Sequence, residues 1–161
     1  MTLNLVILAF VTLQRIGELW LSSRNTQRLL ARGAHEHSPA HYPLIVVVHL
    51  LWLATLWWLA LDRPVDGFWL ALFVAIEIFR IWVLATLGPR WTTRIIVLPD
   101  APLVRRGPYR FVNHPNYLVV VLEIAVLPLV FGLWQAALIF SLLNAAVLTV
   151  RIRAEDRALR R

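Results

Sequence analysis

The chain of 161 residues contains no cysteine and no lysine. Without cysteine it can form no disulfide bond and use no thiol in catalysis, although this absence does not identify a cellular compartment. All of its 16 basic residues are therefore arginines, and the formal net charge is +7. Charged residues of either sign are few, at 16% of the chain, so a large soluble surface is not expected.

Long hydrophobic runs take up most of the remaining sequence. Hydrophobic residues make up 60% of the chain and the mean hydropathy is +0.69, which predicts one integral membrane domain over residues 1–161. A helix needs about 20 residues to cross the hydrocarbon core of a bilayer. We predict an all-α membrane bundle of about five spans, at residues 3–22, 43–62, 67–88, 116–130 and 133–150. The first run has no basic leader and no obvious cleavage site, so we expect an uncleaved span.

The last two spans are expected to form a tight hairpin. The apolar run from Tyr117 to Val150 is too long for one helix, and Pro128 and Gly132 interrupt it near its middle. The fourth span is short, so it must tilt or begin within the headgroup layer.

The arginines are concentrated in the 23–42 and 88–115 loops and in the tail. Basic loops stay cytoplasmic, which predicts an outside amino terminus, a cytoplasmic loop at 89–115 and a cytoplasmic tail at 151–161. Because the charge lies at membrane ends, it is explained by orientation and anionic lipid headgroups, and no nucleic-acid partner is expected. Membrane lipids are the expected surroundings, and the oligomeric state stays open.

Charges also occur inside the predicted spans. Arg15 with Glu18, and Glu77 with Arg80, are opposite charges three residues apart, so each pair shares a helix face, and we expect structural pairing. Glu123 has no basic residue at helical spacing within its own span, which makes it a candidate for catalysis.

Five histidines could offer ligands or bases. His49 in the second span is more often a packing residue than a ligand. His35, His37 and His41 lie in one loop with Glu36, but no carboxylate or sulfur cluster at ligand spacing completes a metal site, so none is expected.

A polar and aromatic segment, from Gly107-Pro108-Tyr109 to His114-Pro115-Asn116-Tyr117, precedes the fourth span. Proline suits the first turn of a helix, and the free amides of a helix start can hold an anionic group. An interfacial helix cap with an aromatic anchor is the plain alternative. A second polar cluster follows the fifth span, where Arg151 and Glu155 share a helix face and Asp156 is next in the chain. Alone, this cluster is typical of a solvated ion pair at a helix end.

Taken in order, these motifs resemble a known family. Over roughly the last 70 residues, the chain resembles the isoprenylcysteine carboxyl methyltransferase family. The matching motifs are, in order, Leu103-Val104-x-x-Gly107-x-Tyr109, His114-Pro115-x-Tyr117, an apolar hairpin and Arg151-x-x-x-Glu155-acid. Members are membrane enzymes that use S-adenosyl-L-methionine in a cytoplasmic pocket and release S-adenosyl-L-homocysteine. The pattern looks most like the small bacterial branch, some of whose members resemble O-methyltransferases of alkylpyrone-type lipids. The resemblance implies a bacterial inner membrane.

The resemblance also assigns expected roles to matching positions. Arg151 would face the methyl acceptor, and Glu155 would contact the amino-acid moiety of the cofactor. The other expected cofactor contacts are Arg94, Ala101, Pro102, Leu103, Val104, Tyr109, His114, Pro115, Asn116 and Tyr117. One departure is Asn113, which replaces the arginine that usually precedes His-Pro, although Arg110 is near enough to substitute.

The expected reaction is O-methylation of a lipophilic small molecule or prenylated acceptor that enters from the bilayer. A carboxylate acceptor would need no base, whereas an enol or phenol must lose a proton to His114, Glu123 or Glu155. Catalytic roles are therefore expected for Arg151, Glu155 and Glu123. Two alternatives stay open. One is a phospholipid N-methyltransferase, and the other is a non-enzymatic transporter or assembly protein in which intramembrane charges line a path.

Overall fold

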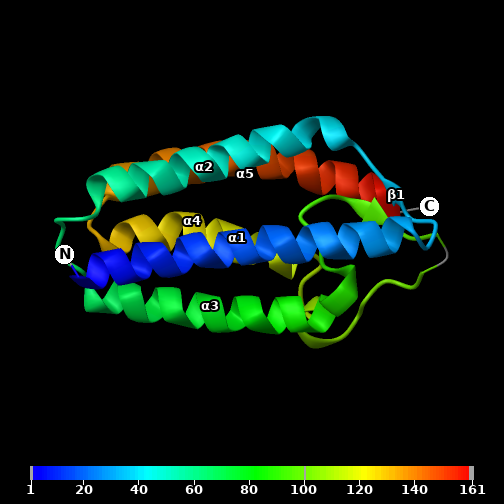
Figure 1. Ribbon diagram of the computed structural model, residues 1–161, viewed down its shortest axis with the longest axis horizontal. Coiled ribbons are helices and arrows are strands. Elements are labelled where there is room, and N and C mark those ends of the chain that lie inside the picture. The colour runs from blue at the N-terminus through cyan, green and yellow to red at the C-terminus, as the bar shows by residue number, and fades with distance from the viewer. Residues whose placement is uncertain (1, 100, 160–161) are drawn as a thin grey trace.

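The computed structural model describes residues 2–99 and 101–159, without the side chain of His41. Five long helices run alongside one another (Figure 1): α1 Thr2–Leu30, α2 Tyr42–Leu59, α3 Gly67–Leu87, α4 Pro115–Val130 and α5 Trp134–Leu159. Short elements between them are β1 His35–Glu36, η1 Pro39–His41, η2 Gly88–Arg90, β2 Ile96–Val97 and η3 Gly107–Arg110. The predicted all-α membrane bundle is confirmed.

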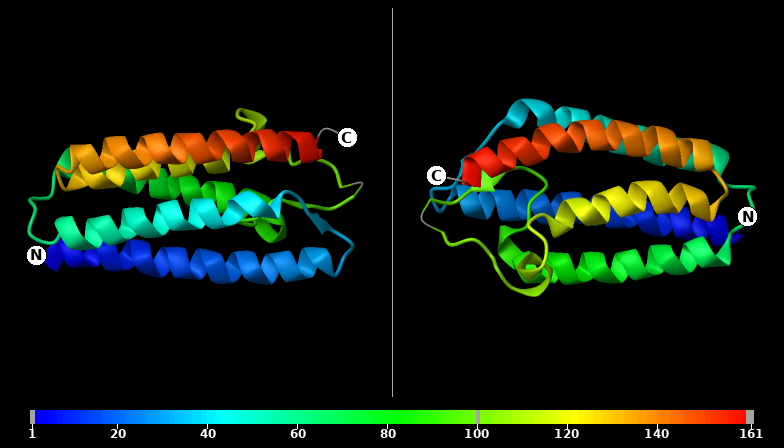
Figure 2. Two further views of the ribbon diagram at one scale, coloured as in Figure 1. Left: turned by 90° about the horizontal axis from the view of Figure 1, so that it is seen from above. Right: turned by 180° about the vertical axis from the view of Figure 1, so that it is seen from behind.

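The helices alternate in direction, so α1 begins and α5 ends at opposite ends of the bundle (Figure 1). Figure 2 shows α1 and α2 on one side, with α4 and α5 behind them and α3 along an edge. Which end faces the cytoplasm stays a prediction. The loops 31–41 and 88–114 meet at the end where α5 finishes, so the segments expected to form the site lie together.

Four described helices, α1, α2, α3 and α5, are long and apolar enough to cross a membrane, whereas α4 has only 16 residues. The position of α4 explains how so short a helix can form part of a membrane bundle. It packs along both α3 and α5, and Tyr117, Glu123, Leu127 and other side chains on it are buried. A helix enclosed by its neighbours exposes little surface to lipid, so its length need not match the bilayer.

The predicted α4–α5 hairpin is present, and Pro128 and Gly132 shape it. Pro128 lies in the last turn of α4, and Gly132 follows with a φ of +68°, a left-handed conformation that glycine adopts without strain. Leu133 N donates to Pro128 O at 2.9 Å and Gly132 N donates to Leu129 O at 3.0 Å. These two bonds form a Schellman motif, which satisfies the free carbonyls at the helix end.

Two boundaries differ from the prediction. α1 continues to Leu30 rather than ending near residue 22, and α5 continues to Leu159, so most of the predicted tail is helical; residues 160–161 lie outside the described part. Hydropathy marks only the membrane-embedded part of a helix, and a polar extension keeps its backbone bonds in water. Asn25, in the extension of α1, donates to Trp91 O at 2.9 Å and so fixes the loop after α3.

A short β pair joins the two loops at this end, which the sequence did not suggest. β1 and β2 are antiparallel, with His35 opposite Val97 and Glu36 opposite Ile96. The outer faces of the helices carry exposed apolar side chains such as Leu13, Trp58 and Ile78, as a surface in contact with lipid requires.

Candidate functional site

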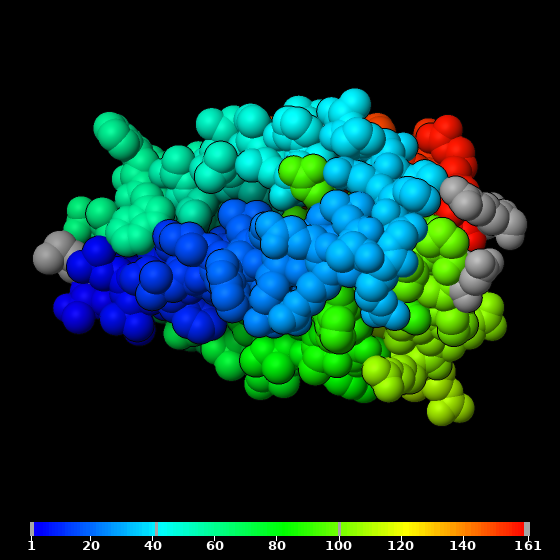
Figure 3. Space-filling view, turned by 45° about the vertical axis from the view of Figure 1, so that its right-hand side comes forward, coloured from blue at the N-terminus to red at the C-terminus, as the bar shows by residue number. Residues whose placement is uncertain are grey.

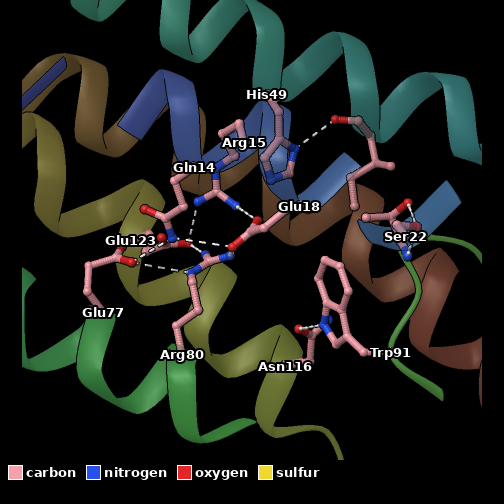
Figure 4. A network of polar contacts seen from close by, with 12 residues as sticks. Gln14, Arg15, Glu18, Ser22, His49, Glu77, Arg80, Trp91, Asn116 and Glu123 are labelled. Atoms are coloured by element: carbon pink, nitrogen blue, oxygen red, sulfur yellow. Dashed lines mark hydrogen bonds and ion pairs between the residues drawn. The ribbon is translucent and has the colours of Figure 1, made fainter. Parts of the chain in front are cut away.

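A network of charged side chains lies inside the bundle and joins α1, α3 and α4 (Figure 4). We call Gln14, Arg15, Glu18, Glu77, Arg80 and Glu123 the charge network. Arg15 bonds Glu18 at 2.9 Å and Glu123 at 2.7 Å, and Arg80 bonds Glu18 at 2.8 Å. Arg80 also contacts Glu123, and its Nε lies 3.7 Å from Glu77. The two pairs expected within α1 and α3 therefore exist, but they are parts of one cross-linked unit.

Glu123, for which a catalytic role was predicted, belongs to the charge network. Glu123 is 1% exposed, and its carboxylate is paired with Arg15 and Arg80, which lie on two other helices. Spacing along one helix cannot reveal partners that tertiary packing supplies. A carboxylate held by two guanidiniums is stabilised in its charged form, so Glu123 links three helices here, and its catalytic role stays a prediction.

A cavity of about 150 Å³, the central cavity, lies beside the charge network. Apolar side chains from α1 and α2, such as Leu19, Ile45 and Leu53, form much of its wall. Arg15, Glu18 and Arg80 reach it from the network, while Tyr117 and Arg151 reach it from α4 and α5. Figure 3 shows a hollow between α1 and α2 through which part of the segment between α3 and α4 is visible. The cavity thus opens sideways, toward the lipid-facing surface.

The end of the central cavity nearest the loops is polar: Thr93, Tyr117 and Arg151 line it, and Glu155 is the hydrogen-bond partner of Tyr117. We call these four residues the polar end. Arg151 Nε donates to the Tyr117 hydroxyl at 2.9 Å, and the Tyr117 hydroxyl donates to Glu155. Arg151 Nη2 donates to the backbone oxygen of Thr93. Arg151 is 4% exposed, and its Nη1 has no hydrogen-bond partner among the described residues. A buried charged donor without a partner is costly, so this atom is suited to hold an anionic ligand group.

Three further side chains, those of His114, Tyr109 and Asn116, lie around the polar end. His114 Nε2 is 3.1 Å from Asp156 Oδ1, and the His114 ring stacks on Tyr117 with 5.5 Å between centroids. Burial, followed by the nearby Glu155 carboxylate, raises the pKa of the Tyr109 phenol, so that this hydroxyl stays protonated. Asn116 accepts a hydrogen bond from the Trp91 indole at 3.0 Å, which holds the loop after α3 against the start of α4.

A second, more polar cavity of about 250 Å³ adjoins the first and shares Leu19, Tyr42 and Thr93 with it. Thr93 Oγ1 lies 2.7 Å from Ser22 Oγ and 3.1 Å from the Tyr42 hydroxyl. Together the two cavities connect an apolar space within the bundle to a hydroxyl-lined space near the loops.

This arrangement of a buried arginine, a tyrosine at the start of α4 and an acid one turn further along α5 coincides with a match to a known family. Residues 69–161, more than half of the chain, match the sequence profile of the Isoprenylcysteine carboxyl methyltransferase (ICMT) family. The chain belongs to this family. Membership makes it a membrane methyltransferase, and the polar end lies wholly within the matched region.

Two relatives share most of their length with this ICMT-family chain. An uncharacterized protein of Bacillus subtilis, YpbQ, is 38% identical over 96% of the chain and 95% of its own length. An uncharacterized protein of Haemophilus influenzae is 26% identical over 90% of the chain and 88% of its own length. No solved structure matches the chain.

The structure brings together most of the residues that the family resemblance singled out. Three of them, Tyr117, Arg151 and Glu155, belong to the polar end itself. Four more lie beside it: His114, Pro115 and Asn116 at the start of α4, and Tyr109 near Glu155. Their roles toward a cofactor or an acceptor stay predictions.

The other predicted cofactor residues lie apart from this cluster. Arg94 pairs with Glu36 at 2.9 Å and lies over the Tyr42 ring, 4.6 Å from its centroid. Ala101, Pro102, Leu103 and Val104 form an extended segment that is partly or largely exposed, and Arg90 donates to Pro102 O at 2.6 Å. Arg94 lines the second cavity together with Thr93. Contact between residues 101–104 and a ligand at the polar end would require the loop to close over it.

Sequence reasoning missed several cavity residues. Thr93 and Trp91 belong to the Arg90-Trp91-Thr92-Thr93-Arg94 segment, which attracted attention only through Arg94, and His49 was expected to be a packing residue. Tyr42 and Ser22 lie outside the matched region, so no family motif could indicate them. Within the described part of the chain, no three His, Asp or Glu residues gather as a metal ion would require.

Proposed function

We propose that the chain is an S-adenosylmethionine-dependent O-methyltransferase whose acceptor is a lipophilic molecule with an acidic oxygen. The observation that carries this proposal is the buried Arg151 Nη1, which has no hydrogen-bond partner in the described part of the chain and lies at the polar end of a cavity with apolar walls. A guanidinium in such a site recognises an oxyanion, while apolar walls accommodate an alkyl or prenyl chain.

The residues present fit the cofactor that enzymes of the family use. The Glu155 carboxylate suits the ammonium of the amino-acid moiety, and His114, just before α4, suits its carboxylate. Trp91 and Tyr42 provide aromatic surface nearby. When bound, this cofactor supplies an electrophilic methyl group on a sulfonium.

The protein's own contribution is then positioning and exclusion of water. Arg151 orients the acceptor oxygen, and its bonds to Tyr117 and Thr93 fix the guanidinium in one place. The apolar side chains of α1 and α2 keep the space around the acceptor dry, which strengthens the interaction between Arg151 and an oxyanion. The opening between α1 and α2 gives a membrane-dissolved acceptor a path that does not cross water.

The same features disfavour methylation of an amine headgroup. Arg151 lines the central cavity but lies outside the charge network, and its guanidinium repels a cationic amine. A lipid carboxylate, enol or phenol carries the complementary charge once ionised.

The test uses the purified protein in detergent with S-adenosylmethionine that carries tritium in its methyl group. We expect label to pass into the organic phase of a lipid extract, and S-adenosylhomocysteine to bind in calorimetry. Treatment of the product with base releases volatile methanol from a carboxyl ester, whereas label from an ether or an N-methyl group stays with the lipid. Absence of both binding and transfer would refute the proposal, and labelled quaternary amine headgroups would replace it with N-methylation.

A further inference from the structure

His49 of α2 lies in the wall of the central cavity and has one ring nitrogen committed to the backbone. Its Nδ1 is 2.7 Å from Ile45 O, one turn earlier in the helix. Because a carbonyl oxygen only accepts hydrogen bonds, Nδ1 carries the proton. In the neutral ring, Nε2 then holds a lone pair. No hydrogen bond to Nε2 is formed by any residue that the structure describes.

The groups facing the same cavity keep this ring neutral at rest. Arg15 and Glu18 face it from α1, Arg80 from α3, Tyr117 from α4 and Arg151 from α5. Figure 4 shows the His49 ring beside Arg15 and Glu18. The guanidiniums oppose a positive charge on the His49 ring in a dry space. The imidazole therefore stays neutral, and the lone pair on Nε2 is available to accept a proton.

The carboxylates of the charge network lie near enough to act on the positive charge of a protonated His49. The network contains the three carboxylates of Glu18, Glu77 and Glu123 and the two guanidiniums of Arg15 and Arg80. With all five ionised, the network carries one surplus negative charge inside the membrane, which is unfavourable. An imidazolium at His49 would make three positive charges against three negative ones. The carboxylates of the network therefore offset part of the repulsion that the guanidiniums exert on an imidazolium at His49.

The three residues expected to accept a proton lie elsewhere. Glu123 is paired with two arginines, His114 is engaged by Asp156, and Glu155 accepts from Tyr117. None of them is among the described residues that line the central cavity, whereas His49 is.

We propose that His49 Nε2 accepts the proton of a hydroxylic lipid acceptor, an enol or a phenol, bound in the central cavity. This inference rests on the proposed O-methyltransferase function and narrows its acceptor class. The acceptor O–H bond breaks, its electron pair stays on oxygen, and the proton bonds to the Nε2 lone pair. The products are an imidazolium beside the charge network and an oxyanion that Arg151 Nη1 can hold.

The experiment compares wild type with His49→Gln on two lipid probes, 3-pentadecylphenol and palmitic acid. Turnover on the phenol is expected to fall roughly 100-fold at neutral pH in the variant, because general base catalysis is lost. Wild-type turnover on the phenol should decline toward acid pH as His49 becomes protonated. The variant should lack that decline and regain rate at alkaline pH, where the phenol ionises without help. Any turnover on palmitate, which is already ionised, should be equal in both proteins.

Two controls separate a catalytic effect from a structural one. Thr55→Val removes a comparable bond on the same helix, from Thr55 Oγ1 to Leu51 O at 2.8 Å, at a half-buried position that does not line the cavity. This variant should leave both rates unchanged. Binding of S-adenosylhomocysteine to His49→Gln should match wild type, which shows that the variant is folded.

The outcomes distinguish this inference from the function beneath it. Wild-type rates and pH profile in His49→Gln would overturn the inference, as would a wild-type protein that methylates palmitate and not the phenol. In both cases the methyltransferase proposal would stand. A wild-type protein that neither binds S-adenosylhomocysteine nor transfers methyl groups to either probe would overturn the function and the inference together.

Discussion

The charge network and the polar end are both buried clusters of arginine and acid, yet they differ in how their arginines are paired. In the charge network, Arg80 contacts Glu18, Glu77 and Glu123, and Arg15 bridges α1 to α4. At the polar end, Arg151 bonds a phenol and a carbonyl, neither of which carries a formal charge. Among the described residues it has no ion-pair partner, and its Nη1 has no hydrogen-bond partner. The first arrangement cross-links helices, whereas the second leaves a positive charge available for a ligand.

The largest expected effect comes from breaking the charge network. Arg80→Ala would leave the carboxylates of Glu18 and Glu123 short of a partner in the bundle interior. Removal of one member of a buried pair costs about 3–5 kcal/mol, so we expect a large loss of stability. Thermal unfolding in detergent would measure it, with Arg63→Ala, at an exposed position in the α2–α3 loop, as the matched control. An unfolding temperature equal to wild type would contradict the structural role of the network.

The network also shows why prediction from sequence succeeded in part. Arg15 with Glu18 and Glu77 with Arg80 could be paired from spacing because each pair lies on one helix. The partners of Glu123 come from α1 and α3, and no periodicity in one span encodes how the other helices rotate against it. The helices and their hairpin were predictable because apolar runs, a proline and a glycine are local signals.

The polar end was predictable for a different reason. Tyr117, Arg151 and Glu155 stand in motifs of a known family, so their proximity could be expected although they are up to 38 residues apart. Thr93 takes part through its backbone oxygen, which any residue could provide, so the residue type at this position does not indicate the contact. His49 lies before the matched region, and its significance depends on which ring nitrogen faces the cavity.

A second, smaller effect would separate the two ligand-facing residues of the polar end. Arg151→Gln should lower turnover about 100-fold while S-adenosylhomocysteine affinity changes little, because Arg151 serves the acceptor. Glu155→Gln should weaken S-adenosylhomocysteine binding at least about tenfold, or about 1.4 kcal/mol, because the ammonium loses its charged partner.

Calorimetry and radiolabel transfer on both variants check this prediction. Arg153→Ala changes an exposed arginine on the same helix and should leave binding and turnover as in wild type. If Arg151→Gln and Glu155→Gln instead gave equal, small changes, the polar end would be only the packing of a helix end, and the methyl acceptor would bind elsewhere.

The smallest effect is expected at Arg94, whose surroundings differ from both buried clusters. Its side chain is 42% exposed, and its guanidinium pairs with Glu36 across the loops and lies over Tyr42. An exposed ion pair contributes about 0.2–1 kcal/mol, because water and salt screen it. Arg94→Ala should therefore lower stability by less than about 1 kcal/mol and change S-adenosylhomocysteine affinity less than about twofold. Glu36→Ala should have the same small effect, since it removes the other half of the pair. A tenfold loss of affinity in Arg94→Ala but not in Glu36→Ala would show that the loop moves and that Arg94 reaches the ligand, as the family resemblance suggested.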